Sequence, residues 1–155
     1  MCSGHDHDHP LHPKIRPLTA IERATWPTTV KVPLQAPHVD ARGEIQPLVD
    51  MPMESCVLIH TKKGAVRANH YHRSDWHFCY VLEGEIEYFE RPTGSNEEPK
   101  KYVIKKGELF FTGPMVDHAM VFPCDGSFLT WGRNSRSQDV YEADVVRIPP
   151  IEPQA

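Results

Sequence analysis

The sequence has few cysteines and no long hydrophobic run, and both absences narrow the classes of protein to which it can belong. Its four cysteines stand far apart and form no CxxC pair: Cys2, Cys56, Cys79 and Cys124. This spacing argues against a disulfide scaffold and against a cysteine-based zinc site. No apolar stretch approaches the roughly 20 residues that a membrane-spanning helix needs, and the N-terminus has no signal-peptide pattern. We therefore expect a cytoplasmic protein with no membrane partner.

The chain also lacks an excess of positive charge. It has 17 Lys and Arg residues against 21 Asp and Glu residues, which gives a net charge of -4. Its basic residues are scattered and form no basic face, so nucleic acid is not an expected partner. A length of 155 residues allows one domain with a sizeable core and leaves no room for a second fold of similar size. A small-molecule partner is the remaining expectation.

Proline is unevenly distributed, with eight of the 15 prolines in residues 1–52. This density excludes helix interiors and central strands. We expect residues 1–52 to be an arm that is extended, built of short edge strands or partly disordered. A short helical turn is predicted in LTAIERATW, where Thr19 caps the turn and Pro27 ends it. An arm of this kind can cover the sheet edges of its own barrel or, by exchange, those of a second subunit, and a homodimer is our expectation.

Short β-rich runs separated by turn residues follow from residue 53 onward. The runs are ESCVLIHT, WHFCYVLE, EIEYFERP, KYVIKKGELFF, HAMVFP, SFLTWG and VYEADVVRIP. Seven such runs with no long amphipathic helix predict an all-β fold, and the number of strands suits a jelly roll. We place this β-barrel domain at residues 53–148 and a C-terminal tail at residues 149–155.

The stretch RANHYHRSDWH, residues 67–77, contains three histidines that could bind a metal ion. His70 and His72 are two residues apart, so they lie on the same face if this segment is a strand. A strand over WHFCYVL turns His77, Cys79 and Val81 to one face. Imidazoles on two neighbouring strands can converge on one ion, and His118 in HAMVF offers a further ligand. Imidazole suits Fe, Mn, Co, Ni, Cu and Zn alike.

Glycines frame these histidines with a recognisable spacing. Gly64, five residues, His70, one residue, His72, four residues, His77, six residues and Gly84 together resemble the first cupin motif, with His77 in place of the usual glutamate. The segment GELFFTGPMVDHAMVF resembles the second cupin motif and carries His118 at its metal-binding position. It departs from that motif at the turn, which reads Gly-Pro-Met, and at the terminal asparagine, which is Phe122. The resemblance covers roughly residues 55–135.

The resemblance to small single-domain cupins of the cupin 2 type implies a jelly-roll barrel that holds one divalent transition metal ion, often in a homodimer. Carried over position by position, it implies the metal ligands His70, His72, His77 and His118. Four neutral imidazoles would leave the charge of the ion uncompensated, which strengthens it as a Lewis acid and favours an anionic substrate.

Three functions remain open at this stage. The leading hypothesis is a non-haem metal-dependent dioxygenase, an oxidoreductase that acts on a small metal-chelating organic substrate. The alternative is an isomerase, epimerase or lyase of carbohydrate or small-acid metabolism, metal-dependent or metal-free. The third is a ligand-binding or sensor protein without turnover. Candidates for an acid or base are Tyr88, Tyr102 and Glu108.

Several other residues have both a functional and a structural interpretation. Cys79 could be a thiol beside the metal, although a small core residue is the commoner case. Met120 is interpreted as a core residue, and Trp76 and Trp131 as barrel packing. Arg133 and Arg136, in the loop WGRNSRSQD, could recognise a carboxylate or phosphate, although solvated loop arginines are the commoner case. The N-terminal HDHDH is either a chelating tail or a polar end without structure.

Overall fold

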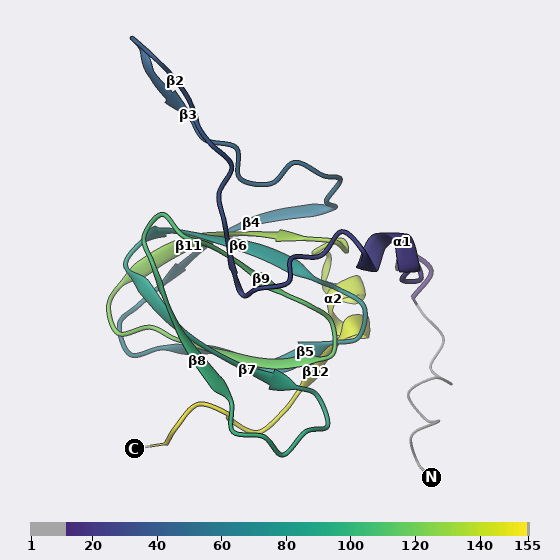
Figure 1. The fold of residues 1–155 in the computed structure, drawn as a ribbon. Coiled ribbons are helices and arrows are strands. Elements are labelled where there is room, and N and C mark those ends of the chain that lie inside the picture. Colours follow the sequence, from purple (N-terminus) through teal and green to yellow (C-terminus); the bar gives the residue numbers. More distant parts are fainter. Residues whose placement is uncertain (1–11, 155) are drawn as a thin grey trace.

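Two five-stranded sheets face each other and form the barrel (Figure 1). The computed structural model describes residues 12–154, so the HDHDH segment lies outside the described residues. The first sheet has the order β1 (Lys31–Val32), β9 (Leu109–Thr112), β6 (His77–Glu83), β11 (Gly126–Gly132) and β4 (Ser55–Thr61). The second has the order β12 (Val145–Arg147), β5 (Val66–His72), β10 (Val116–Val121), β7 (Glu85–Pro92) and β8 (Lys100–Lys105).

All strand pairs of the two sheets are antiparallel, and the predicted all-β jelly roll is confirmed. The remaining elements are the short helix α1 (Ala20–Arg23), the hairpin of β2 (His38–Asp40) and β3 (Gly43–Ile45), and the helix α2 (Gln138–Asp144). The division into an arm of residues 1–52, a barrel of 53–148 and a tail of 149–155 stays a prediction.

Strand β6 shows how the alternation of side chains builds the barrel. Cys79 and Val81 belong to the core between the sheets, together with Ile86, Tyr88, Ile104, Phe110, Phe122 and Phe128. Trp76 and Phe78 lie in a different cluster with Leu109 and Phe111. The predicted division of this segment into two faces is therefore confirmed, and His77 lies on the same side as Cys79, where both line a cavity.

The N-terminal segment packs against the cluster around Trp76 and Phe78. Its half-buried contributions are Leu18, Trp26, Val32, Val49, Met51 and Met53. Strand β1 also pairs with β9 and so occupies one edge of the first sheet. Fully burying a large apolar side chain contributes about 1.5–3 kcal/mol, so each of these half-buried side chains contributes less. These contacts explain why a segment with so many prolines is held on the barrel.

Helix α1 is tied to the barrel by a buried ion pair. Thr19 caps the helix by accepting a hydrogen bond from the backbone of Glu22, as predicted. The Arg133 guanidinium donates to both carboxylate oxygens of Glu22, at 2.7 and 3.0 Å, and its side chain is only 1% exposed. Burial alone would raise the pKa of Glu22, but hydrogen bonds from Arg133 and Trp76 lower it. Arg133 is therefore a buried structural residue, so both expectations for it are wrong: it is not a solvated loop arginine, and its guanidinium is already bound to a carboxylate of the protein.

Two β-rich runs of the sequence are interrupted in the structure. KYVIKKGELFF forms β8 and β9 with a turn between them, where Gly107 has φ +83° and donates its backbone N–H to the carbonyl of Val81. VYEADVVRIP is not one strand, because its first half completes α2 and only Val145–Arg147 forms β12. The helix turns Val140 and Asp144 inward, four residues apart on one face.

A bulge in β5 sets the position of the histidines. Ala68 and Asn69 both have positive φ, +70° and +55°, and the pairing with β10 shifts there, so that His118 faces His70 while Ala119 faces Ala68. Bulges of this kind redirect side chains next to functional sites. The Asn69 side chain accepts a hydrogen bond from the backbone of Ile151 and donates to Glu152, which ties the C-terminal segment to the bulge.

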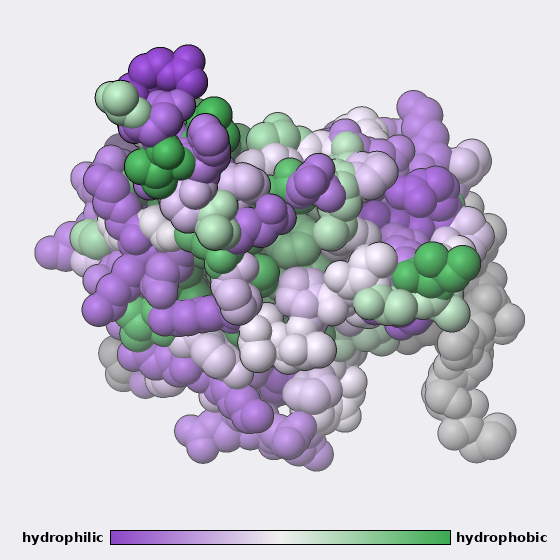
Figure 2. Space-filling view, turned by 45° about the horizontal axis from the view of Figure 1, so that its top comes forward, coloured by the Kyte–Doolittle hydropathy of each residue, from purple (hydrophilic) through white to green (hydrophobic). Residues whose placement is uncertain are grey.

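The hairpin of β2 and β3 projects from the barrel (Figure 1), and hydrophobic side chains lie on its surface (Figure 2). Val39 and Ile45 are about two thirds exposed, at 65% and 66%. A lone two-stranded hairpin is marginally stable in water, so a covering partner would stabilise it. Homodimerisation stays a prediction. None of the helices in residues 12–154 is long and apolar enough to cross a membrane.

Removing one partner of the buried ion pair should destabilise the fold. In Glu22→Ala the Arg133 guanidinium would stay buried without a carboxylate, and the loss of one partner of a buried pair costs about 3–5 kcal/mol. Urea unfolding at pH 7.5 measures this loss. Glu142→Ala is the control, because Glu142 pairs with Arg147 at the surface and should change stability little. Equal effects of the two variants would contradict this account of the pair.

Candidate functional site

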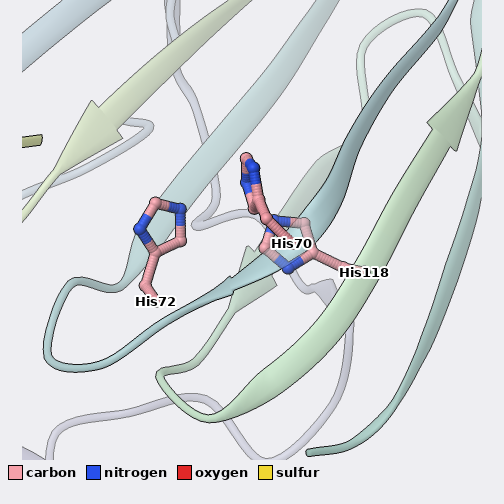
Figure 3. A group of neighbouring side chains, drawn as sticks. All are labelled: His70, His72 and His118. Carbon is pink, nitrogen blue, oxygen red and sulfur yellow. The ribbon is translucent and has the colours of Figure 1, made fainter. Parts of the chain in front are cut away.

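A cavity of about 320 Å³ opens inside the barrel and contains the four histidines identified in the sequence. His70 and His72 come from β5, His77 from the start of β6, and His118 from β10. Figure 3 shows His70, His72 and His118 grouped together, with their rings turned toward one another. The two sheets thus bring together residues that are up to 48 positions apart in the chain.

Three of these histidines form a group with the geometry of metal ligands. The ligand atoms of His70, His72 and His118 all lie within 4.8 Å of one another. The ring centre of His70 is 4.8 Å from that of His72 and 4.7 Å from that of His118. Metal–nitrogen bonds of about 2.0–2.1 Å hold two bound nitrogens at most about 4.2 Å apart, so a small inward movement of these rings would let the group surround a single divalent ion.

Hydrogen bonds at the far side of two rings orient them toward this shared space. Nδ1 of His72 lies 3.1 Å from a carboxylate oxygen of Asp144, and Nδ1 of His118 lies 2.9 Å from the carbonyl oxygen of Val116. Both partners accept hydrogen bonds, so each Nδ1 carries the proton and each Nε2 keeps its lone pair. Metal-binding histidines are held in this way. The residues present therefore fit a metal ion.

Burial keeps these imidazoles neutral, as metal binding requires. Desolvation and the neighbouring histidines lower the pKa of His70 to about 2. The same two causes lower the pKa of His118 to about 3. Burial also lowers the pKa of His72, although the hydrogen bond with Asp144 opposes that change.

His77 lies beside this group but has a different partner. Its ring centre is 4.7 Å from that of His72, yet its Nε2 lies 2.9 Å from a carboxylate oxygen of Asp75. Burial alone would lower the pKa of His77, but the Asp75 carboxylate outweighs burial and raises it. Asp75 in turn has a lowered pKa, because His77 and other donors offset the effect of its own burial. The role of His77 as a fourth ligand stays a prediction.

The two buried carboxylates beside the histidines are saturated by protein donors. Asp144 accepts from the backbone and hydroxyl of Ser74 and from the backbone of Asp75. Asp75 accepts from the backbone N–H groups of Trp76 and Asn134. Although Asp75 and Asp144 lie close enough to His72 to form a second cluster of potential ligands, these hydrogen bonds occupy them. They position imidazoles and are poor candidates for binding an ion.

Other candidates from the sequence have structural roles. Cys79 lines the cavity, but burial raises the pKa of its thiol to about 12, so it is no nucleophile at neutral pH. The Tyr88 hydroxyl is buried and hydrogen-bonded to Glu90 and Thr112. Glu108 contacts Lys31 and the backbone of Lys105, outside the cavity.

Four further candidates are placed as follows. Tyr102 is half-buried against the core and does not line the cavity. Trp76 and Trp131 pack in the apolar cluster beside the arm, in agreement with the structural interpretation. Met120 both packs against the core and lines the cavity.

Sequence reasoning missed Asp144 and Tyr141, which both come from helix α2. Asp144 is 72 residues from the His72 that it orients, and Tyr141 lines the cavity with its ring centre 5.7 Å from that of His72. Both lie in the segment interpreted as a strand. The available signal was the spacing of Val140 and Asp144, four residues apart, which suits one face of a helix.

Comparison with known proteins supports the resemblance found in the motifs. Residues 57–131 match the family model described as "Cupin domain", which supports placing the chain in the cupin superfamily. No curated protein gives a significant match.

Several solved structures share the fold at low sequence identity. The capsular polysaccharide assembling protein CapF of Staphylococcus aureus is 19% identical, with TM-score 0.55, over 75% of this chain and 34% of CapF. This chain therefore spans about a third of CapF. A 3,4-ketoisomerase from Helicobacter canadensis is 17% identical, with TM-score 0.60, over 73% of this chain and 86% of that one. The dTDP-4-dehydrorhamnose 3,5-epimerase of Sulfolobus tokodaii is 16% identical, with TM-score 0.55, over 66% and 69%.

The lowered pKa values predict that the metal-free protein loses stability in acid. Below pH about 6.5 the unfolded chain takes up a proton at His70, His72 and His118, whereas the folded chain does not. The unfolded state is therefore favoured as the pH falls, by at most about 1.4 kcal/mol per pH unit for each histidine. The pKa of His77 is raised, so His77 adds stability as the pH falls toward about 6.5, but below that value it is protonated in both states and leaves the slope unchanged.

Urea unfolding of the chelator-treated protein at several pH values between 7.5 and 5 measures the slope. His118→Asn should make the slope shallower, because it removes one of the three groups. A stability that is constant or rises toward pH 5 would show that the imidazoles are not held neutral.

Proposed function

We propose that the protein is a metal-dependent isomerase or epimerase that moves a proton next to a carbonyl group of a small organic substrate. This proposal rests on one observation: the same cavity holds histidines in two different environments. His70, His72 and His118 are suited to hold an ion, whereas His77 is paired with the Asp75 carboxylate. A metal site and an acid–base residue are the two elements that such a reaction needs.

The chain's own residues account for the proton transfer. With Nε2 of His77 held by Asp75, its Nδ1 is the atom that can take a proton from the carbon beside the carbonyl. Asp75 stabilises the imidazolium that forms, and the same Nδ1 then returns the proton on the same face at the neighbouring carbon, which gives the isomer; epimerisation would draw the proton from a donor on the opposite face, such as solvent. A divalent ion on the three imidazoles would supply Lewis-acid polarisation of the carbonyl.

The solved structures favour this proposal over the dioxygenase that led the sequence interpretation. A ketoisomerase and an epimerase are among the proteins with this fold. Their low identity shows only the shared fold, so the site itself carries the argument. An oxygenase needs no paired acid–base residue, whereas the Asp75–His77 pair has a direct use in isomerisation.

Metal content tests the ligand set. To exclude binding by the N-terminal tail, all proteins carry asparagine at His5, His7 and His9. This background protein, purified without a tag, should contain one divalent metal ion per chain by elemental mass spectrometry. His118→Ala should lose the ion, because two imidazoles remain, and His77→Ala should retain it. Loss of metal in His77→Ala would instead support the four-histidine site predicted from the sequence.

Proton exchange tests the reaction. Metal-loaded protein is incubated under argon in D₂O with a panel of small ketones and keto acids, and NMR follows the protons next to each carbonyl. We expect exchange with at least one member, lost on chelation and reduced by about 10²-fold or more in His77→Ala. Exchange that survives chelation would indicate a metal-free epimerase. Absence of exchange, or turnover only with oxygen present, would contradict the proposal and restore the dioxygenase hypothesis.

A further inference from the structure

The described residues that line the histidine cavity include no negatively charged side chain. None of its 16 lining residues is Asp or Glu, whereas Arg67, Arg136 and four histidines are among them. The buried carboxylates nearby, Asp75 and Asp144, are occupied by donors as described above. Of the groups in residues 12–154 that line this cavity, a ligand therefore meets neutral and positive ones, and a bound divalent ion would add to the positive potential.

Arg136 lines this cavity and has no hydrogen-bonded or salt-bridged partner among residues 12–154. Its guanidinium carbon lies 3.7 Å from the centre of the Tyr141 ring, and that ring is 5.7 Å from the ring of His72. Within residues 12–154 no carboxylate lies at salt-bridge distance from Arg136. The side chain is thus held at the mouth of the cavity by a ring contact that leaves its edge N–H donors available.

The other arginines near the cavity are already engaged. Arg67 donates to the Thr61 hydroxyl at 2.8 Å and to the His60 carbonyl at 3.2 Å. Arg147 donates to both carboxylate oxygens of Glu142, at 2.9 and 2.8 Å. Arg133 is buried against Glu22. Arg136 therefore differs from these arginines in having no hydrogen-bond acceptor among residues 12–154, whereas Arg67, which bonds only neutral oxygens, adds positive charge to the same cavity.

We propose that Arg136 is a specificity-determining residue that binds an oxyanionic group, a carboxylate or a phosphate monoester, on the substrate of this site. The planar guanidinium fork matches either group. The oxyanion would sit against Arg136 at the cavity mouth while the carbonyl end reaches the three histidines and His77. This inference rests on the proposed function for the carbonyl end of the substrate, but the anion site can be tested separately.

Calorimetric titration of the full-length protein with matched ligands tests the inference. The probes are 4-oxopentanoate, its neutral amide 4-oxopentanamide, and dihydroxyacetone phosphate, so that the carboxylate, the uncharged group and the phosphate are compared. The metal-loaded wild type should bind at least one anion about tenfold or more tightly than the amide. Whether 4-oxopentanoate or dihydroxyacetone phosphate shows the larger preference identifies the oxyanion.

Arg136→Met should abolish this preference while keeping its metal, and Arg136→Lys should retain part of it, because the charge remains but the fork is lost. Arg23→Met is the matched control, since Arg23 also lies over an aromatic ring, at 5.4 Å from the centre of Trp26, but lines no part of the cavity. It should bind as the wild type does.

Equal affinity of the wild type for both anions and the amide, or an unchanged preference in Arg136→Met, would overturn the inference. The same titrations on chelator-treated protein separate it from the proposed function. A preference that persists there and depends on Arg136 supports the anion site even if the metal proposal fails. A metal-bound protein without any preference for anions leaves the proposed function standing and removes the anion site.

Discussion

The hydrogen bonds to the Asp144 carboxylate hold the site together. One of its oxygens accepts from the backbone and hydroxyl of Ser74, and the other contacts Nδ1 of His72 and accepts from the backbone of Asp75. A single buried side chain at the end of α2 thus fixes the last residue of β5 and the loop that leads to His77. In a buried environment each of these bonds is strong, and losing the carboxylate would leave several donors unsatisfied.

This carboxylate belongs to a polar network that reaches the N-terminal arm. Ser74 accepts from the Asn134 amide, whose oxygen accepts from Arg133, and Arg133 pairs with Glu22 on α1. The arm is therefore connected to the histidines through buried hydrogen bonds as well as through the apolar contacts around Trp76. Networks of this kind rigidify a site when every member is satisfied. The arm, which precedes the histidines by about fifty residues in the sequence, is thus part of the hydrogen-bond network that positions them.

The sequence predicted the barrel from the alternation of its strands, and the resemblance to the cupin motifs predicted four converging histidines, of which His70, His72 and His118 form the closest group. Alternation along β6 separated the face that lines the cavity from the face that packs against the arm. His70 and His72 follow the bulge at Ala68 and Asn69, so they still lie on the same face of β5. The partners of the histidines depend on contacts between distant segments. Asp144 could not be assigned to His72, since VYEAD contains residues with high strand propensity and was interpreted as a strand. Arg133 and Arg136 look alike in the loop, and only the fold distinguishes the buried one from the free one.

The central claim is that three imidazoles hold an ion while His77 stays outside its coordination shell, paired with Asp75. X-ray absorption spectroscopy of the metal-loaded protein, with the tail histidines replaced, counts the imidazoles bound to the ion directly. The account predicts three imidazole ligands, with the remaining positions filled by water or another light atom, and the same spectrum in His77→Ala. A fourth imidazole that disappears in His77→Ala would contradict it and assign His77 to the metal.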